Sequence, residues 1–168
     1  MKIGIMSDSH DNLTAIRLAV KFFRQAGISY LMHAGDIVAS FSATEILAAS
    51  VPVTAVFGNN DGEKAGLRDI LGSSVFEPPY AFVTPFEPKR KILITHDLSK
   101  VDKKLYEEVD IVIHGHTHKV SVVTEGKTKI INPGETCGWL YGKSSVIILD
   151  WETLETEVHH IALPGDRK

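Results

Sequence analysis

The sequence has one cysteine, no long hydrophobic run and no excess of basic residues, and each shortage excludes a class of protein. Cys137 has no second thiol with which to form an internal disulfide, so a reducing compartment is the expected environment. No apolar run reaches the length that spans a bilayer, and the residues after Met1 do not follow the pattern of a secretion signal. We therefore expect a cytoplasmic protein with no membrane partner.

The charge balance excludes one kind of partner. Eighteen Lys and Arg residues against 21 Asp and Glu give a formal net charge of −3. Bulk nucleic-acid binding needs an excess of basic side chains to neutralise phosphates, so it is not expected, whereas a small phosphate-bearing substrate stays compatible. With 168 residues, 43% of them hydrophobic and 23% charged, the chain has the size and composition of one globular domain, spanning residues 1–168.

Strand-like and helix-like segments alternate in the first half, which is typical of an α/β protein with a parallel sheet covered by helices. The strands expected there are 2–7, 30–34 and 51–57, and the helices are 13–26, 41–49 and 63–71. After Pro78 and Pro79 we expect short strands at 80–83, 91–95, 111–114, 120–124, 128–131, 144–150 and 155–161, with one helix near 101–108. Two facing sheets with helices outside would accommodate this pattern.

Polar side chains that can bind metal follow five of the expected strands. They are Asp8 and His10, then Asp36, then Asn59, then His96 with Asp97, and finally His114, His116 and His118. In open α/β sheets, ligands bind outside the carboxyl ends of the strands, so these five strand ends are expected to converge.

The residue types predict which metals would bind. Imidazole nitrogens mixed with carboxylate and amide oxygens suit Mn, Fe, Co, Ni or Zn better than Mg or Ca. Seven candidate ligands are too many for one tetrahedral zinc and suit two ions that share a carboxylate. Such a pair lowers the pKa of a bridging water and holds the oxygens of a phosphate.

Each cluster alone also has an ordinary structural explanation. Asp8 and the following serine are typical of a helix N-cap, Gly35-Asp36 is typical of a turn, and a single histidine such as His96 predicts nothing. The alternating histidines from His114 to His118 are a stronger signal, because alternate residues of an extended segment face the same side. The ordered set, with every member at a strand end, favours a metal site over coincidence.

The order of these motifs resembles the calcineurin-like metallophosphoesterase superfamily. The matching motifs are Asp8-Ser9-His10, Gly35-Asp36, Gly58-Asn59-Asn60-Asp61, His96 and Gly115-His116-Thr117-His118. The short chain and the segment Asn132-Pro133-Gly134-Glu135 resemble the small prokaryotic phosphodiesterase branch of that superfamily. The resemblance implies a four-layer αββα sandwich with two mixed sheets, and a hydrolase that cleaves phosphodiesters.

The resemblance also implies a division of labour at the site. Asp8, His10, Asp36 and His118 would hold the first metal, and Asp36, Asn59, His96 and His116 the second, with Asp36 bridging. A hydroxide between the metals would attack phosphorus in line with the leaving oxygen. Mn²⁺ is the first expectation, with Ni²⁺, Co²⁺, Fe²⁺ or Zn²⁺ as alternatives. Asp36, Asn59, Asn60 and Asp61 are the expected catalytic residues.

The sequence departs from the superfamily at position 60. Many members have a histidine directly after the third-motif asparagine, and this chain has Asn60, which cannot donate a proton at a suitable pKa. We therefore expect weak activity on monoesters with poor leaving groups and better activity on activated or strained phosphodiesters. Phosphomonoesterase or protein phosphatase activity at the same site is an alternative function.

A non-catalytic scaffold is the alternative from another class, because a eukaryotic retromer subunit has the same fold and an altered metal site. The complete ligand set of this chain favours catalysis. Asp11, His114 and Asp97 are expected to support the ligands, with capping or structural roles as competing explanations. A small phosphodiester is the expected substrate, and a homo-oligomer, a dimer or a tetramer, is the assembly that the resemblance allows.

Overall fold

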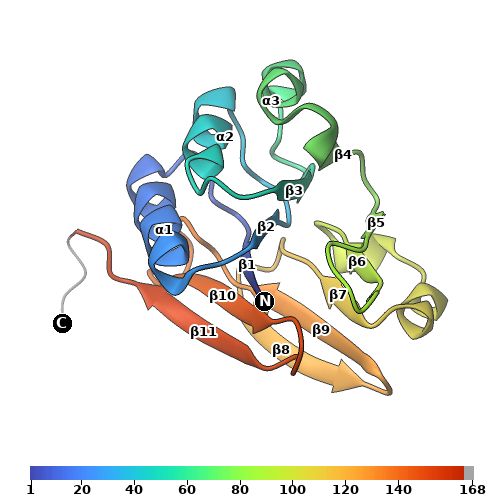
Figure 1. The fold of residues 1–168 in the computed structure, drawn as a ribbon. Helices are drawn as coiled ribbons and strands as arrows, with labels where there is room; N and C mark the ends of the chain where they lie inside the picture. Colours follow the sequence, from blue (N-terminus) through green and yellow to red (C-terminus); the bar gives the residue numbers. More distant parts are fainter. Residues whose placement is uncertain (165–168) are drawn as a thin grey trace.

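The computed structural model describes residues 1–164, which form two β-sheets that face each other (Figure 1). The strands of the first sheet are β1 (Lys2–Met6), β2 (Tyr30–His33), β3 (Val53–Val56), β4 (Val75–Phe76), β10 (Ser144–Asp150) and β11 (Thr156–Ile161). They lie in the order β11-β10-β1-β2-β3-β4. The pairs from β1 to β4 are parallel, and β10 is antiparallel to both of its neighbours.

The second sheet is also mixed. Its strands are β5 (Ala81–Val83), β6 (Ile92–Ile94), β7 (Ile111–Ile113), β8 (Val120–Glu125) and β9 (Thr128–Pro133), in the order β5-β6-β7-β9-β8. The strands β6, β7 and β9 are parallel, whereas the edge strands β5 and β8 are antiparallel to their neighbours. Both sheets are therefore mixed, as expected.

Three helices cover the outer face of the first sheet: α1 (Leu13–Ala26), α2 (Ser40–Leu47) and α3 (Lys64–Leu71). The side chain of Asn12 accepts a hydrogen bond from the backbone N–H of Ala15 and so caps α1. Ile16, Val20 and Phe23 recur at helical spacing and are buried against the sheet. These contacts fix α1 beside the loop that follows β1.

The space between the sheets is filled by a second group of apolar side chains. On β1, Ile3 and Ile5 point into this space, while Met6 packs with the helices on the opposite face. Trp151 is fully buried in the same layer. Because both faces of β1 are covered, its residues after Lys2 are apolar throughout rather than alternating with polar ones.

Two elements differ from the sequence prediction. The helix expected near 101–108 is a 3₁₀ segment, η3 (Lys103–Glu108), which follows another short one, η2 (Leu98–Lys100). The short strand β4, preceded by the 3₁₀ turn η1 (Gly72–Ser74), was not expected, because two residues carry no periodic signal. Within the described residues, the outer face of the second sheet is thus covered by 3₁₀ segments, with Leu105 and Tyr106 packed on it.

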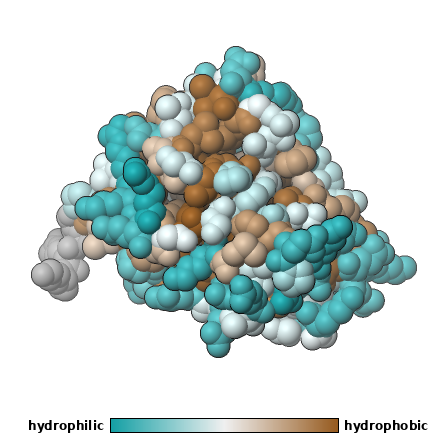
Figure 2. Space-filling view, in the orientation of Figure 1, coloured by the Kyte–Doolittle hydropathy of each residue, from teal (hydrophilic) through white to brown (hydrophobic). Residues whose placement is uncertain are grey.

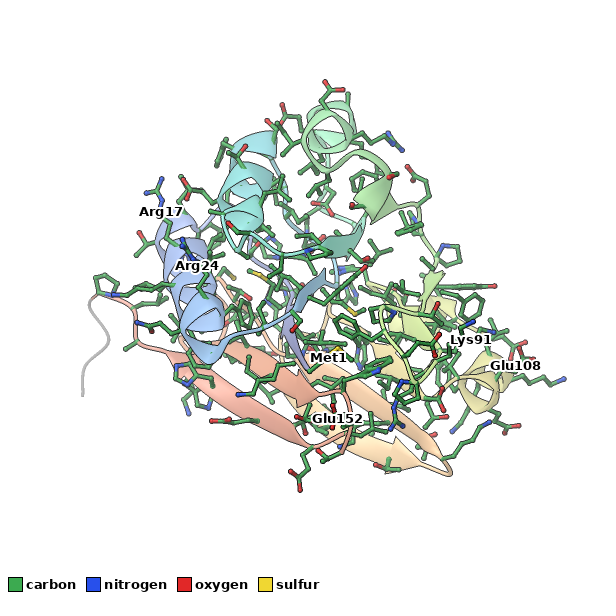
Figure 3. The ribbon with its side chains drawn as sticks, viewed as in Figure 1. Met1, Arg17, Arg24, Lys91, Glu108 and Glu152 are labelled. Carbon is green, nitrogen blue, oxygen red and sulfur yellow. The ribbon has the colours of Figure 1, made fainter. Side chains whose placement is uncertain are left out.

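The N-terminus is held by an ion pair at the surface. The ammonium of Met1 lies 3.5 Å from a carboxylate oxygen of Glu152, and both residues are labelled in Figure 3. Figure 2 shows hydrophobic side chains gathered over the region of α2 and α3, and these helices carry the exposed residues Phe41, Leu47 and Ile70. In the described part of the chain, no helix combines the length and the apolar character that crossing a membrane requires.

Candidate metal centre

The polar side chains singled out in the sequence meet at one end of the two sheets. Asp8 and His10 follow β1, Asp36 follows β2, and Asn59 follows β3. In the second sheet, His96 follows β6, and His116 and His118 follow β7. Backbone hydrogen bonds join these loops, because Asp8 N donates to the carbonyl of Gly35 and Gly115 N donates to that of His96. The parallel strands therefore bring their carboxyl ends together, as predicted.

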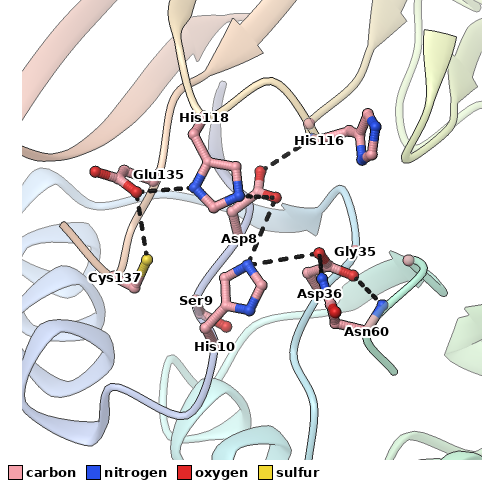
Figure 4. Close-up of polar contacts among 12 residues, drawn as sticks. Asp8, Ser9, His10, Gly35, Asp36, Asn60, His116, His118, Glu135 and Cys137 are labelled. Carbon is pink, nitrogen blue, oxygen red and sulfur yellow. Dashed lines mark hydrogen bonds and ion pairs between the residues drawn. The ribbon is translucent and has the colours of Figure 1, made fainter. Parts of the chain in front are cut away.

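Asp8, His10 and His118 form one group of potential metal ligands (Figure 4). His118 Nε2 lies 3.4 Å and His10 Nε2 4.0 Å from Asp8 Oδ1, and His10 Nε2 is also 3.5 Å from Asp36 Oδ2. The imidazole rings of His10 and His118 are stacked, with centroids 5.2 Å apart. This group matches the first ligand set that the resemblance implies, with Asp36 at its edge.

A second group surrounds the other side of Asp36. His96 Nε2 lies 3.4 Å from Asp36 Oδ2 and 3.0 Å from Asn59 Oδ1. His116 Nδ1 lies 2.9 Å from the same Asn59 oxygen. Asp36 therefore stands between the two groups, which is the position expected of a carboxylate shared by two metals.

The atoms of these groups fit a cation better than they fit one another. His96 Nδ1 lies 2.8 Å from the carbonyl oxygen of Ala34, which accepts its proton, so in the neutral ring the lone pair of Nε2 faces the oxygens of Asn59 and Asp36. Asp8 Oδ1 and His10 Nε2 are buried without a hydrogen-bond partner among the described residues. Acceptor atoms that face acceptor atoms in a buried site fit divalent metal ions.

The backbone supports the same interpretation. Asp8, His10, Asp36, His116 and His118 all have positive φ values, between 40° and 67°. Side-chain-bearing residues rarely adopt this left-handed conformation, and such strain is concentrated at functional sites. Here the five candidate ligands with this conformation all lie in the loops that follow β1, β2 and β7.

Glycines beside the ligands let the loops approach each other. A Cβ atom on Gly58 would collide with Asp36, and one on Gly115 would collide with Ser7 and approach Asp8 Oδ2 to 2.7 Å. Both positions therefore require glycine for close packing against a candidate ligand. The Gly-Asn and Gly-His pairs of the sequence motifs have this physical reason.

The charges of the site are strongly coupled. Burial raises the pKa of Asp36, but hydrogen bonds from His96 and Asn60 and the charge of His96 outweigh it and hold the pKa well below its usual range. In the site without a metal ion, burial lowers the pKa of His96, but the hydrogen bond and charge of Asp36 leave the pKa above its ordinary value. For Asp8, burial prevails over the nearby histidines and raises the pKa. A carboxylate that stays ionised between imidazoles is suited to bridging two cations.

Asn60 and Asp61 hold Asp36 in place. The backbone N–H and the side-chain amide of Asn60 donate to the two oxygens of Asp36, at 2.8 and 2.7 Å. The buried carboxylate of Asp61 accepts the backbone N–H groups of Asp36, Val38 and Gly58 at 2.6–3.0 Å. The catalytic roles expected for these two residues stay predictions, and their contacts favour positioning of the bridging ligand.

Glu135 is a functional candidate to which the sequence analysis assigned no role, although it names the residue as part of the Asn132-Pro133-Gly134-Glu135 segment. Its Oε2 lies 2.8 Å from His118 Nδ1, so it accepts the ring proton and leaves Nε2 as the atom that faces Asp8. The backbone N–H groups of Leu140 and Tyr141 and the thiol of Cys137 donate to the same buried carboxylate. A carboxylate behind a histidine ligand is the usual support of a metal site, and only its pairing across the fold reveals it.

The three supporting residues expected from the sequence have other contacts. Asp11 accepts from the backbone N–H of Ala39 and the hydroxyl of Ser42 at the start of α2, and Asp97 caps η2 through Ser99. His114 is buried and lies 3.3 Å from the side-chain amide of Asn132. The capping and structural explanations account for these contacts, none of which reaches a candidate ligand.

Comparison with known proteins agrees with this geometry. The family model for the calcineurin-like phosphoesterase superfamily domain matches residues 1–154. Phosphodiesterase MJ0936 from Methanocaldococcus jannaschii is 36% identical over 165 residues, which cover 92% of this chain and 96% of that protein. The solved structure of an archaeal phosphodiesterase superposes with a TM-score of 0.83 at 34% identity, covering 95% of this chain and 99% of the other.

A more distant structure shares the fold alone. Vps29 from Entamoeba histolytica, solved in complex with Zn²⁺, superposes with a TM-score of 0.67 at 16% identity, over 96% of this chain and 100% of the other. The family model and the archaeal relatives instead match the sequence of this chain over most of its length. The chain belongs to the calcineurin-like phosphoesterase superfamily, and it is a metal-dependent hydrolase of phosphoric esters.

Proposed function

We propose that this protein hydrolyses a small phosphodiester at a dinuclear metal centre. The observation that carries the proposal is the placement of Asp36 between two complete ligand groups. One group consists of Asp8, His10 and His118, and the other of Asn59, His96 and His116. Two divalent cations, when bound there, supply a water of lowered pKa and neutralise charge on the phosphate oxygens.

The residues of the chain have three tasks in this proposal. The histidines and Asn59 bind, Asp36 is shared, and Asn60 and Asp61 keep Asp36 oriented by the hydrogen bonds described above. Mn²⁺ is the metal we propose, with Ni²⁺, Co²⁺, Fe²⁺ and Zn²⁺ as alternatives, because all of them accept mixed nitrogen and oxygen ligands.

The identity of residue 60 supports diesters over monoesters. The side-chain amide of Asn60 donates to Asp36 Oδ2, and an amide does not transfer a proton to a poor leaving group near neutral pH. A phosphodiester with an acidic leaving group needs no such donor. The monoesterase alternative therefore predicts similar rates on alkyl monoesters and on activated diesters, and our proposal predicts much slower cleavage of the monoesters.

The experiment is hydrolysis of bis(p-nitrophenyl) phosphate by the full chain with Mn²⁺ or Ni²⁺, compared with EDTA and with Asp36→Ala. We expect Asp36→Ala to reduce the rate of hydrolysis more than about a hundredfold. Even residues that only support a metal ligand change metal affinity or activity about 10–100-fold when they are replaced. Asp69→Ala, an exposed carboxylate on α3, is the matched control and should retain the wild-type rate. Absence of metal-dependent activity above that of Asp36→Ala would favour the scaffold alternative.

A further inference from the structure

A pocket of about 220 Å³ opens beside the second ligand group. Asn59, His96 and His116 form the end of the pocket that faces the metal centre. The remaining lining residues are Phe57, Gly58, Pro78, Pro79, Asp97 and Lys100. The volume corresponds to about seven water molecules at ~30 Å³ each, which suits one ring system.

The wall opposite the ligands is fixed in place. Phe57 is almost fully buried, and Lys64 Nζ and Arg68 Cζ lie 5.0 and 5.1 Å from the centroid of its ring. Both cations pair with Glu77, the residue next to Pro78. These contacts join α3, the ring of Phe57 and the segment that carries the prolines, so the apolar wall exists before a ligand arrives.

The same wall is tied to a metal ligand. The hydroxyl of Thr95 donates to the carbonyl of Pro79 at 2.5 Å, and Thr95 directly precedes His96. The position of Pro79 is therefore set relative to the imidazole of His96. A phosphate at the metal centre would project an ester group at a fixed distance from this wall.

The pocket offers little hydrogen bonding. The nitrogens of His96 are directed at Ala34 and at the metal centre, and Asp97 Oδ1 accepts from the N–H and hydroxyl of Ser99. Among the described residues, Lys100 has no ion pair, and its side chain is exposed at the pocket. A cation on a flexible stem beside flat apolar walls is suited to lie over the face of an aromatic ring.

We propose that this pocket binds a planar aromatic or heteroaromatic ring carried by one ester group of the substrate. The inference rests on the proposed phosphodiesterase function and narrows its substrate class to aryl or nucleoside-like phosphodiesters rather than simple alkyl ones. Pro78 and Pro79 contact the ring, and Lys100 covers its open face. These residues determine specificity and take no part in the bond-breaking step.

The test uses two probes that differ in the organic group alone and contain a C–P bond that the hydrolase does not cleave. Binding of phenylphosphonate and methylphosphonate to the Mn²⁺-loaded full chain is measured by calorimetry. We expect phenylphosphonate to bind at least about tenfold more tightly, the effect of burying a phenyl-sized apolar group. The measured quantity is the ratio of the two dissociation constants, that of methylphosphonate over that of phenylphosphonate. The double variant Pro78→Ala/Pro79→Ala should reduce this ratio to below about three.

A second variant tests the pocket without altering its proline wall. Lys100→Ala should reduce the ratio about two- to fivefold, the range of an exposed cation–π contact. Lys104→Ala, an exposed lysine of η3 outside the pocket, should leave the ratio at the wild-type value. A ratio near one in the wild-type protein, or an unchanged ratio in both pocket variants, would overturn the inference.

The outcomes separate this inference from the proposed function. If the protein hydrolyses bis(p-nitrophenyl) phosphate but binds both phosphonates equally, the ring subsite is wrong and the phosphodiesterase function stands. If it hydrolyses no diester with any of the metals, the proposed function fails, and the substrate class inferred from it fails too.

Discussion

At the residue scale, the carboxylate behind His118 is the strongest new feature of the site. Glu135→Gln removes the charge that accepts the Nδ1 proton and leaves His118 free to take the wrong tautomer. We expect the affinity for Mn²⁺ to fall about 10–100-fold, measured by calorimetric titration of the metal-free chain. Glu125→Gln, an exposed residue of β8 that pairs with Lys103, is the control and should bind as the wild type does. Equal affinities in both variants would rule out the positioning role.

A second residue-scale prediction concerns His33, which is fully buried on β2. Its Nδ1 accepts the N–H of Gly35, so Nε2 carries the proton and donates to the hydroxyl of Ser9. Burial, reinforced by the charge of His96, lowers the pKa of His33 to about 3. The folded state therefore disfavours the proton that the unfolded chain binds below about pH 6.5.

The sign of the pH effect follows from this difference. The contribution of His33 to stability is complete above about pH 6.5 and is lost progressively as the pH falls toward 3, reaching a loss of about 2 kcal/mol at pH 5. Urea unfolding of the metal-free protein at pH 8 and pH 5 measures it. His33→Asn should show a correspondingly smaller difference between the two pH values, and His160→Asn, on the exposed edge strand β11, should behave as the wild type. If the unfolding free energy of His33→Asn differed between pH 8 and pH 5 by as much as that of the wild type, the prediction would be contradicted.

At the scale of elements, the sequence predicted the strands better than the segments between them. Short apolar runs that end in polar residues identify β1, β2 and β3, and apolar residues at helical spacing identify α1. The segment 103–108 lacks such a stripe, and the structure has a 3₁₀ turn series there instead of an α-helix. The strand β4 pairs through two residues only, Val75 and Phe76, so tertiary pairing with β3 defines it.

The loops show the same division. Residue types alone placed Asp8, Asp36, Asn59 and the histidines at strand ends, and these strand ends do converge. The left-handed conformation of five ligands was not predictable, because it is imposed by loops packed against one another rather than by local preference. Asp11 and Asp97 were ambiguous for a related reason: an acidic residue after a strand can cap the next turn or support a ligand, and only its neighbours decide.

At the scale of the whole molecule, metal binding and stability are linked. The proposed ligands come from both sheets, so a metal bound between them would hold the sheets together. It would stabilise the folded state, because the unfolded chain does not form the site. With Mn²⁺ at about a hundred times its dissociation constant, one site adds about 2.7 kcal/mol, which corresponds to about 5–11 °C in Tm for a chain of this size. Calorimetric melting with Mn²⁺ and with EDTA measures the difference.

Asp36→Ala provides the comparison, because it removes the ligand shared by both groups. Its Tm should respond to Mn²⁺ much less than that of the wild type, while Asp69→Ala should respond fully. A wild-type Tm that is the same in Mn²⁺ and in EDTA would show that the two sheets do not share a bound metal.

The sequence by itself determined the alternation of elements, the family and the set of ligand types, because hydrophobic period and residue chemistry are local properties of the chain. Tertiary structure alone decided which ligands face each other, since His96 and Ala34 or His118 and Glu135 meet only when the strands are paired. It also decided the pocket beside the second ligand group, whose walls come from the end of β3, the segment of Pro78 and Pro79 and the turn after β6. Distances between residues far apart in the chain follow from packing, and no local pattern encodes them.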